Sequence, residues 1–123
     1  MHSWFSSHTR TAPKYAYAMG YVHGLRHLHA RGRRCRLVWT PHVEHSRALI
    51  LEAAQQCAKH ERVLVIGSGP LYDVPVAQLS WRFAEVVLAD IVHLRRVRQK
   101  VRGYKNVRLV TIDVTAMGEA LYD

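Results

Sequence analysis

Three short apolar runs, each ending in a glycine turn or an aspartate, constrain the fold of this chain most strongly. The runs are Val63–Ile66, Val86–Ala89 and Val107–Ile112, and segments with helical spacing of apolar residues separate them. A run without polar alternation is typical of a parallel strand covered on both faces. The order strand, helix, strand, helix, strand predicts half of a doubly wound sheet. We therefore expect an α/β fold, an incomplete Rossmann-like parallel sheet of about three strands.

The two segments between the runs are expected to be crossover helices. In the first, Asp73 is a candidate N-cap, and the inward-facing residues would be Val76, Leu79 and Phe83. Both crossovers should be right-handed, which places this helix and the one over 93–102 on the same face of the sheet. The first strand then keeps an unpaired edge, and we expect a homodimer or a partner chain there.

The N-terminal part of the chain differs in composition from the rest. Residues 1–60 hold nine Lys and Arg and eight His but only two acidic residues, whereas residues 61–123 hold nine basic and seven acidic residues. We expect residues 1–40 to be a basic, His-rich, partly helical segment. Residues 41–123 would form the truncated Rossmann-like domain.

Helices are also expected before the first strand. The spacing of apolar residues predicts one helix over 14–30, followed by a basic linker over Arg31–Arg36. Thr40 is a good N-cap and Pro41 suits the first position of a helix. The sequence therefore predicts a second helix from Pro41 to about His60.

The carboxyl ends of the three runs carry the residues best suited to bind a ligand. Ligands of open parallel sheets bind at this edge. Gly67 and Gly69 allow the backbone to approach a ligand closely and to turn sharply into a helix. Asp90, 21 residues after Gly69, can accept both hydroxyls of a ribose. Asp113 is placed to accept from an adenine amino group, with a helix cap or a loop residue as its alternative role.

These residues resemble the cofactor half of a class I S-adenosylmethionine-dependent methyltransferase. The matching motifs are Val63-Leu-Val-Ile-Gly-Ser-Gly-Pro-Leu71, Val87-Leu-Ala-Asp-Ile91 and Leu109-Val-Thr-Ile-Asp-Val114, within residues 61–115. The resemblance implies S-adenosylmethionine as cofactor and transfer of its methyl group to an acceptor that the sequence does not identify. The residues that it implies for cofactor binding are Gly67, Ser68, Gly69, Pro70, Asp90, Ile91, Asp113 and Val114.

Two positions depart from the family pattern. The family usually has an acidic residue two positions before its first glycine, where this chain has Val65, and Leu71 occupies the third glycine position. The segments that complete the family's sheet and acceptor pocket lie outside the resemblance, so the catalytic residues are unknown. Two alternatives stay open: a non-catalytic binding module, and a nicotinamide-dinucleotide half domain. The missing third glycine disfavours the second alternative.

Several weaker signals bear on partners and location. Arg31–Arg36 and the basic helix over 93–102 could contact phosphates of a nucleic acid, although a solvated basic face is the favoured interpretation. The histidines lack the further ligands of a zinc site, so no metal is expected. Two cysteines without a CxxC pair, no run long enough to span a membrane and no signal peptide predict a cytoplasmic protein.

Two aromatic residues have either a packing role or a place in a pocket. Tyr72, beside the glycine loop, could line a pocket for the cofactor or the acceptor, but packing is favoured. Trp39 is expected to cover the sheet or the helix that follows it.

Overall fold

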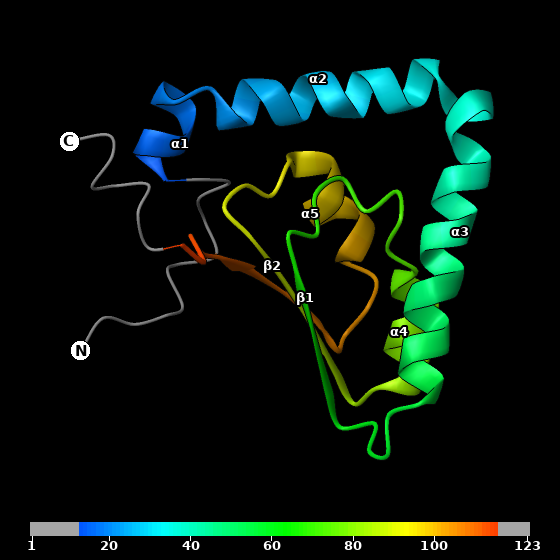
Figure 1. Ribbon diagram of the computed structural model, residues 1–123. Helices are drawn as coiled ribbons and strands as arrows, with labels where there is room; N and C mark the ends of the chain where they lie inside the picture. Colours follow the sequence, from blue (N-terminus) through cyan, green and yellow to red (C-terminus); the bar gives the residue numbers. More distant parts are fainter. Residues whose placement is uncertain (1–12, 116–123) are drawn as a thin grey trace, which may run out of the picture.

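The computed structural model describes residues 13–115, which form an incomplete Rossmann-like α/β fold preceded by helices (Figure 1). The elements in chain order are α1 (Lys14–Ala18), α2 (Tyr21–Arg34), α3 (Arg36–Gln55), β1 (Arg62–Ile66), α4 (Val76–Arg82), β2 (Glu85–Asp90), α5 (Arg95–Val101) and β3 (Val107–Thr111). All strands are parallel, in the order β1-β2-β3. The predicted fold class is confirmed.

The core lies on one face of the sheet. In register across the three strands, Val63 pairs with Val86, which pairs with Val107. These side chains pack in one cluster with buried residues of both crossover helices, among them Leu79 of α4 and Val97 of α5. Burying a side chain of this size contributes about 1.5–3 kcal/mol. The prediction that both helices cover the same face is therefore confirmed.

The other face of the sheet is open over β1. Leu64 and Ile66 point to this face and are 56% and 59% exposed. The prediction of a first strand covered on both faces is therefore wrong for the part of the chain described here, because no described helix packs on that side. Among the strands within residues 13–115, only β2 has the burial expected of a central strand, since its four residues between Glu85 and Asp90 are all buried.

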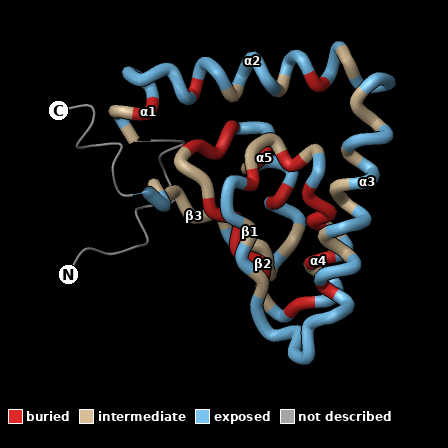
Figure 2. The backbone as a smooth tube through the Cα atoms, viewed as in Figure 1, coloured by how far each residue is buried: buried red, intermediate tan, exposed pale blue. Residues whose placement is uncertain are grey.

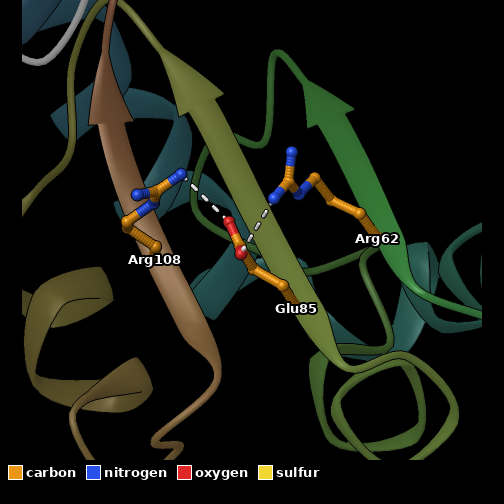
Figure 3. A network of polar contacts seen from close by, with 3 residues as sticks. All are labelled: Arg62, Glu85 and Arg108. Carbon is orange, nitrogen blue, oxygen red and sulfur yellow. Dashed lines mark hydrogen bonds and ion pairs between the residues drawn. The ribbon is translucent and has the colours of Figure 1, made fainter.

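A row of charges crosses the amino-terminal end of this open face (Figure 3). Glu85 on β2 lies between Arg62 on β1 and Arg108 on β3, with N···O distances of 3.6 Å and 2.9 Å. Because all three side chains are partly exposed, each pair contributes no more than about 1 kcal/mol. The face is thus charged where the strands begin and apolar at Leu64 and Ile66.

The N-terminal helices differ from the prediction in two places. The helix predicted over 14–30 is divided at Gly20, whose φ of 81° is left-handed and ends α1. The segment Arg31–Arg36 is helical rather than a linker, because α2 continues to Arg34 and α3 begins at Arg36. Arginine is a good helix former, and cations in a last turn interact favourably with the helix dipole.

Helix α3 begins five residues earlier than predicted. Pro41 is inside the helix rather than at its first position, and Thr40 is no N-cap. The Thr40 hydroxyl instead donates to the Arg36 carbonyl at 2.5 Å. Proline leaves the Leu37 carbonyl without its usual helical donor, but Leu37 is 90% exposed, so solvent reaches this part of the helix. The predicted domain boundary at 40/41 falls within this continuous helix.

Figure 1 shows α2 and α3 as two sides of a corner around the sheet and its crossover helices, and Figure 2 shows that both helices are largely exposed. Helix α2 approaches the loop after β1 closely. A Cβ built on Gly32 would lie 2.4 Å from Cε2 of Tyr72, in the loop after β1. The Tyr72 hydroxyl donates to the His29 carbonyl at 2.6 Å, and the two rings stack with centroids 5.4 Å apart.

We expect Gly32→Ala to destabilise the protein and Gly24→Ala to stabilise it. Both glycines lie inside α2, where alanine is favoured by about 0.5–1 kcal/mol. A methyl group meets nothing within 4 Å at Gly24 but overlaps the Tyr72 ring at Gly32. Urea unfolding of both variants measures the difference. Equal stabilisation by the two substitutions would show that α2 does not dock against Tyr72.

Candidate functional site

A cavity of about 510 Å³ lies at the carboxyl ends of the three strands. It is lined by Tyr21, Ile66, Gly67, Ala89, Asp90, Ile91, Ile112, Asp113, Val114 and Thr115. The structure thus brings five of the eight predicted site residues to one cavity, from all three strand ends. This is the edge at which ligands of open parallel sheets bind.

The loop after β1 depends on its two glycines for backbone conformation. Gly67 and Gly69 have φ values of 72° and 55°, which L-amino acids with side chains rarely adopt. A Cβ at either position would meet no neighbour within 4 Å. The glycines are therefore required by the left-handed turn, and they leave open space where a ligand can approach the backbone.

The loop does not lead directly into a helix, contrary to the prediction. Helix α4 begins at Val76, and the Asp73 side chain makes no capping hydrogen bond to it. Pro75 takes the N-cap position and has no side-chain donor or acceptor to offer. The free N–H groups of α4 therefore lie several residues beyond the glycine loop, so the site relies on loop backbone and on carboxylates.

Asp90 connects the glycine loop to the end of β2. Its Oδ2 accepts the Gly69 N–H at 2.8 Å and its Oδ1 accepts the Ile91 N–H at 2.7 Å. Each carboxylate oxygen can accept two hydrogen bonds, so each keeps one acceptor position. Asp90 can therefore hold the loop and still accept from two neighbouring hydroxyls, as a ribose would present.

Asp113 is engaged more fully by its own surroundings. Its Oδ1 accepts from the Thr115 N–H at 3.0 Å and from the Thr115 hydroxyl at 2.6 Å. The Tyr15 hydroxyl of α1 lies 3.4 Å from Oδ2. The bonds to Thr115 are those of an aspartate that stabilises its own turn. Both roles considered from the sequence, adenine acceptor and loop residue, are compatible with this arrangement.

Three of the predicted site residues do not line the cavity. Ser68 is buried, and its Oγ has no hydrogen-bond partner in the described part of the chain. Gly69 acts through its bond to Asp90, and Pro70 lies between these residues and the buried Leu71. The next residue, Tyr72, packs against α2 and lines a different cavity, as described below.

Five residues that line the cavity are not among the predicted site residues: Tyr21, Ile66, Ala89, Ile112 and Thr115. Ile66 and Ala89 are the last residues of the first two apolar runs, and Thr115 directly follows Val114. Tyr21, at the start of α2, comes from a segment far from the strand ends in sequence, and no motif marks it. Ile112 was treated only as the end of the third strand. Its backbone N–H donates to the Asp90 carbonyl at 2.9 Å, which places it at the cavity. The one signal for Ile112 in the sequence was its position at the end of an apolar run, directly before Asp113.

A buried histidine lies just behind the site. His93 is 2% exposed, and its Nε2–H donates to the Val110 carbonyl at 2.8 Å, which leaves Nδ1 without a partner among the described residues. Burial lowers the pKa of His93 below its ordinary value of 6.5, and the charge of Arg98 acts in the same direction. The bond to Val110 and the charge of Asp90 oppose this shift without reversing it.

Acidification from about pH 8 to about pH 5 is therefore expected to lower the free energy of unfolding. Because the pKa of His93 is lower in the folded chain, the unfolded chain takes up the proton first as the pH falls. The contribution of His93 to the free energy of unfolding is fully present above its ordinary pKa. It is lost as the pH falls from that value toward the lower pKa of the folded chain. Urea unfolding at both pH values, with His93→Gln beside the unmodified chain, measures this. The variant should lose less stability, and an equal loss would assign the effect to other groups.

The described residues contain no group of three His, Cys, Asp or Glu side chains that could hold a metal ion. His23 and His27 come together on α2, with ring centroids 4.3 Å apart, but no third ligand joins them there. None of the described helices has both the length and the apolar character that crossing a bilayer requires.

Comparison with known proteins gives no relative: no family model, no curated protein and no solved structure matches the chain.

Proposed function

We propose that this chain binds S-adenosylmethionine across the carboxyl ends of its three strands, as the cofactor-binding part of a methyltransferase. The observation that carries the proposal is the hydrogen bond from Gly69 to Asp90 at the rim of the 510 Å³ cavity. It unites the two strongest sequence signals, the glycine turn and the aspartate after the second strand. The acceptor of the methyl group is not identified.

The residues present fit the parts of this cofactor. Asp90 keeps acceptor positions for two ribose hydroxyls. Ile91, Ile112 and Val114 provide apolar surface for an adenine ring, and Val114 is 58% exposed before any ligand covers it. The open space beside Gly67 suits a polar chain that approaches the loop backbone. A volume of about 510 Å³ lies within the roughly 300–1,000 Å³ of small-molecule sites.

The chain's own contribution to a reaction would be binding and orientation. When bound, S-adenosylmethionine supplies an electrophilic methyl group on a sulfonium. Asp90 would fix the ribose and thereby the position of the rest of the molecule relative to the glycine loop. Holding two reactants in line can supply much of the rate increase of a transfer reaction. No side chain of the described site is assigned to proton transfer.

The two alternatives make different demands on the same site. A nicotinamide dinucleotide needs a helix N-terminus at its pyrophosphate. Here α4 begins at Val76, and Leu71 replaces the third glycine, which disfavours that ligand. A non-catalytic binding module would use the same cavity without turnover. Methyl transfer from labelled S-adenosylmethionine to candidate acceptors separates that alternative from an enzyme.

Mapping S-adenosylhomocysteine, the product form of the cofactor, onto the amide spectrum tests the proposal directly. We expect the largest shifts at Gly67, Gly69 and Ile91, whose amides lie at the loop and at Asp90. Gly103, at the far end of α5, serves as the internal control. Shifts spread evenly over the chain, or none at the loop, would overturn the proposed site.

We further propose that the protein is located in the cytoplasm, where its two free cysteines would remain reduced.

We also propose that a second copy of the chain pairs with the open edge of β1. Leu64, beside this edge, is 56% exposed. Sedimentation should give a dimer for the unmodified chain and a monomer for Leu64→Lys. Trp81→Lys, which changes an 85% exposed residue of α4, should stay dimeric. A monomeric unmodified chain with one cooperative unfolding transition would contradict the pairing.

A further inference from the structure

Helices α2 and α3 meet at a corner (Figure 1). A second cavity, of about 400 Å³, is lined by residues from both helices. Its walls come from the end of α2, the first half of α3, the loop after β1 and α5. It shares no lining residue with the cavity at the strand ends. The two cavities are therefore separate candidate sites.

Basic side chains from three helices converge on this cavity. They are Arg33 of α2, Arg36 and Arg47 of α3, and Lys100 of α5, and Glu44 is the one acidic residue among them. In the described part of the chain, none of these four cations forms an ion pair with a carboxylate. A solvated basic face would spread its charges over one helix surface, whereas here they surround a single hollow.

Two observations show that this charge is not compensated by the residues that the structure describes. The Nε atom of Arg47 is buried and has no acceptor among the described residues, and such buried donors are rare in folded proteins. Burial lowers the pKa of Lys100, and the charge of Arg47 lowers it further. The two cations therefore repel each other across a partly desolvated space, and a bound anion would relieve both costs.

The remaining walls suit a planar group. Trp39 and Tyr72 both line the cavity. One face of the Tyr72 ring is stacked on His29, and its hydroxyl is used by α2. Trp39 is half-buried and makes no ring contact with another described aromatic residue. Stacking on an indole tolerates every base, because each base has a π-face.

A single anion would leave much of this cavity unfilled. A phosphate has five non-hydrogen atoms, and at no more than a water's share of about 30 Å³ for each atom it fills less than half of the space. We infer that the cavity at the α2–α3 corner binds a nucleotide, with its phosphate among Arg33, Arg36, Arg47 and Lys100 and its base against Trp39. The nucleotide can be free or part of an RNA strand.

Uridine 5′-monophosphate is the first probe, because it lacks the adenine that the strand-end cavity would take. We expect it to bind more tightly than either uridine or inorganic phosphate, since each of these fills one part of the cavity only. A hexamer of uridylate distinguishes a free nucleotide from an RNA strand as the natural ligand. Tighter binding of the hexamer would identify RNA as the source, and tighter binding of the monophosphate would identify a free nucleotide.

The chain has a net charge of +9 and would attract anions nonspecifically. Two substitutions that each remove one positive charge distinguish this attraction from binding at the cavity. Arg47→Gln removes a cation of the cavity, and Arg26→Gln removes an exposed cation of α2 outside it. We expect about a tenfold loss of affinity from the first and less than about twofold from the second, as for a charge-assisted hydrogen bond. Equal losses, or no binding by the unmodified chain, would overturn the inference.

Two further variants keep the test decisive if Arg47→Gln does not fold. Trp39→Leu should weaken binding of the monophosphate and leave binding of inorganic phosphate unchanged, because it removes only the stacking surface. Val114→Glu, which adds a negative charge to the strand-end cavity without changing the glycine loop, should leave monophosphate binding intact. A loss of that binding in Val114→Glu would place the nucleotide at the strand ends instead and contradict the second site.

Discussion

At Leu71, glycine is expected to destabilise the protein less than alanine does, the reverse of the usual order. Leu71 is fully buried, and its φ of 66° is left-handed, a conformation that costs a residue with a side chain about 1–2 kcal/mol. Either substitution loses the buried side chain, at about 2–5 kcal/mol. Glycine alone also removes the backbone strain, and this gain exceeds its extra unfolded-state entropy of about 0.4–1 kcal/mol.

Leu79 provides the matched control for this comparison. It is also fully buried, but it lies inside α4 with helical backbone. There, Leu79→Gly should be less stable than Leu79→Ala by about 1 kcal/mol. Free energies of unfolding from urea titrations of the four variants decide the matter. The same order of alanine over glycine at both positions would show that the backbone at Leu71 is not left-handed.

The second prediction concerns Asp90. Its replacement by asparagine should lower the affinity for S-adenosylhomocysteine at least about tenfold. Asparagine has the same shape, but its amide nitrogen cannot accept the hydrogen bond from Gly69 or from a ribose hydroxyl. Asp73→Asn is the control, because Asp73 is an exposed carboxylate of the same loop region outside the cavity. Its affinity should stay within about twofold of the unmodified chain. Equal effects of the two substitutions would contradict a specific role for Asp90.

A 2′-deoxy analogue of S-adenosylhomocysteine separates a ribose contact from an effect on the loop alone. The unmodified chain should bind the analogue more weakly than the parent compound. In Asp90→Ala the two ligands should bind with similar affinity, because neither carboxylate oxygen remains to accept from that hydroxyl. If the difference between the two ligands persists in the variant, Asp90 acts only by holding Gly69.

The sequence predicted the sheet well because buried parallel strands leave a direct signal. The run from Val86 to Ala89 is apolar throughout and is buried throughout. The first run looks the same in sequence but is covered on one face only. Whether the second face of β1 is covered depends on the elements that pack beside it. The sequence of residues 63–66 does not indicate this.

The helices before the sheet were harder to predict because local signals conflicted there. Thr40 and Pro41 form a good start signal, yet the helix begins at Arg36 and continues through the proline. Arg31–Arg36 looked like a charged linker, although arginine favours helices intrinsically. The turn at Gly20, where φ is left-handed, divides a segment that the apolar spacing predicted as one helix over 14–30.

The candidate site was predictable where it depends on strand ends and unpredictable where it depends on tertiary contacts. Gly67, Asp90 and Asp113 follow the strands directly, so sheet topology alone brings them together. Tyr21 and Tyr15 reach the same region from the N-terminal helices, and their positions follow from how those helices pack. The basic cavity was likewise visible only as separate charges until the α2–α3 corner brought Arg47 close to Lys100.

Calorimetric titration of S-adenosylhomocysteine into the unmodified chain, with NAD⁺ titrated in parallel, tests the central claim most directly. We predict a saturable signal with one site per chain for S-adenosylhomocysteine and none for NAD⁺. A folded chain that binds neither compound, or that binds NAD⁺ more tightly, would contradict a cofactor site built on Gly69 and Asp90.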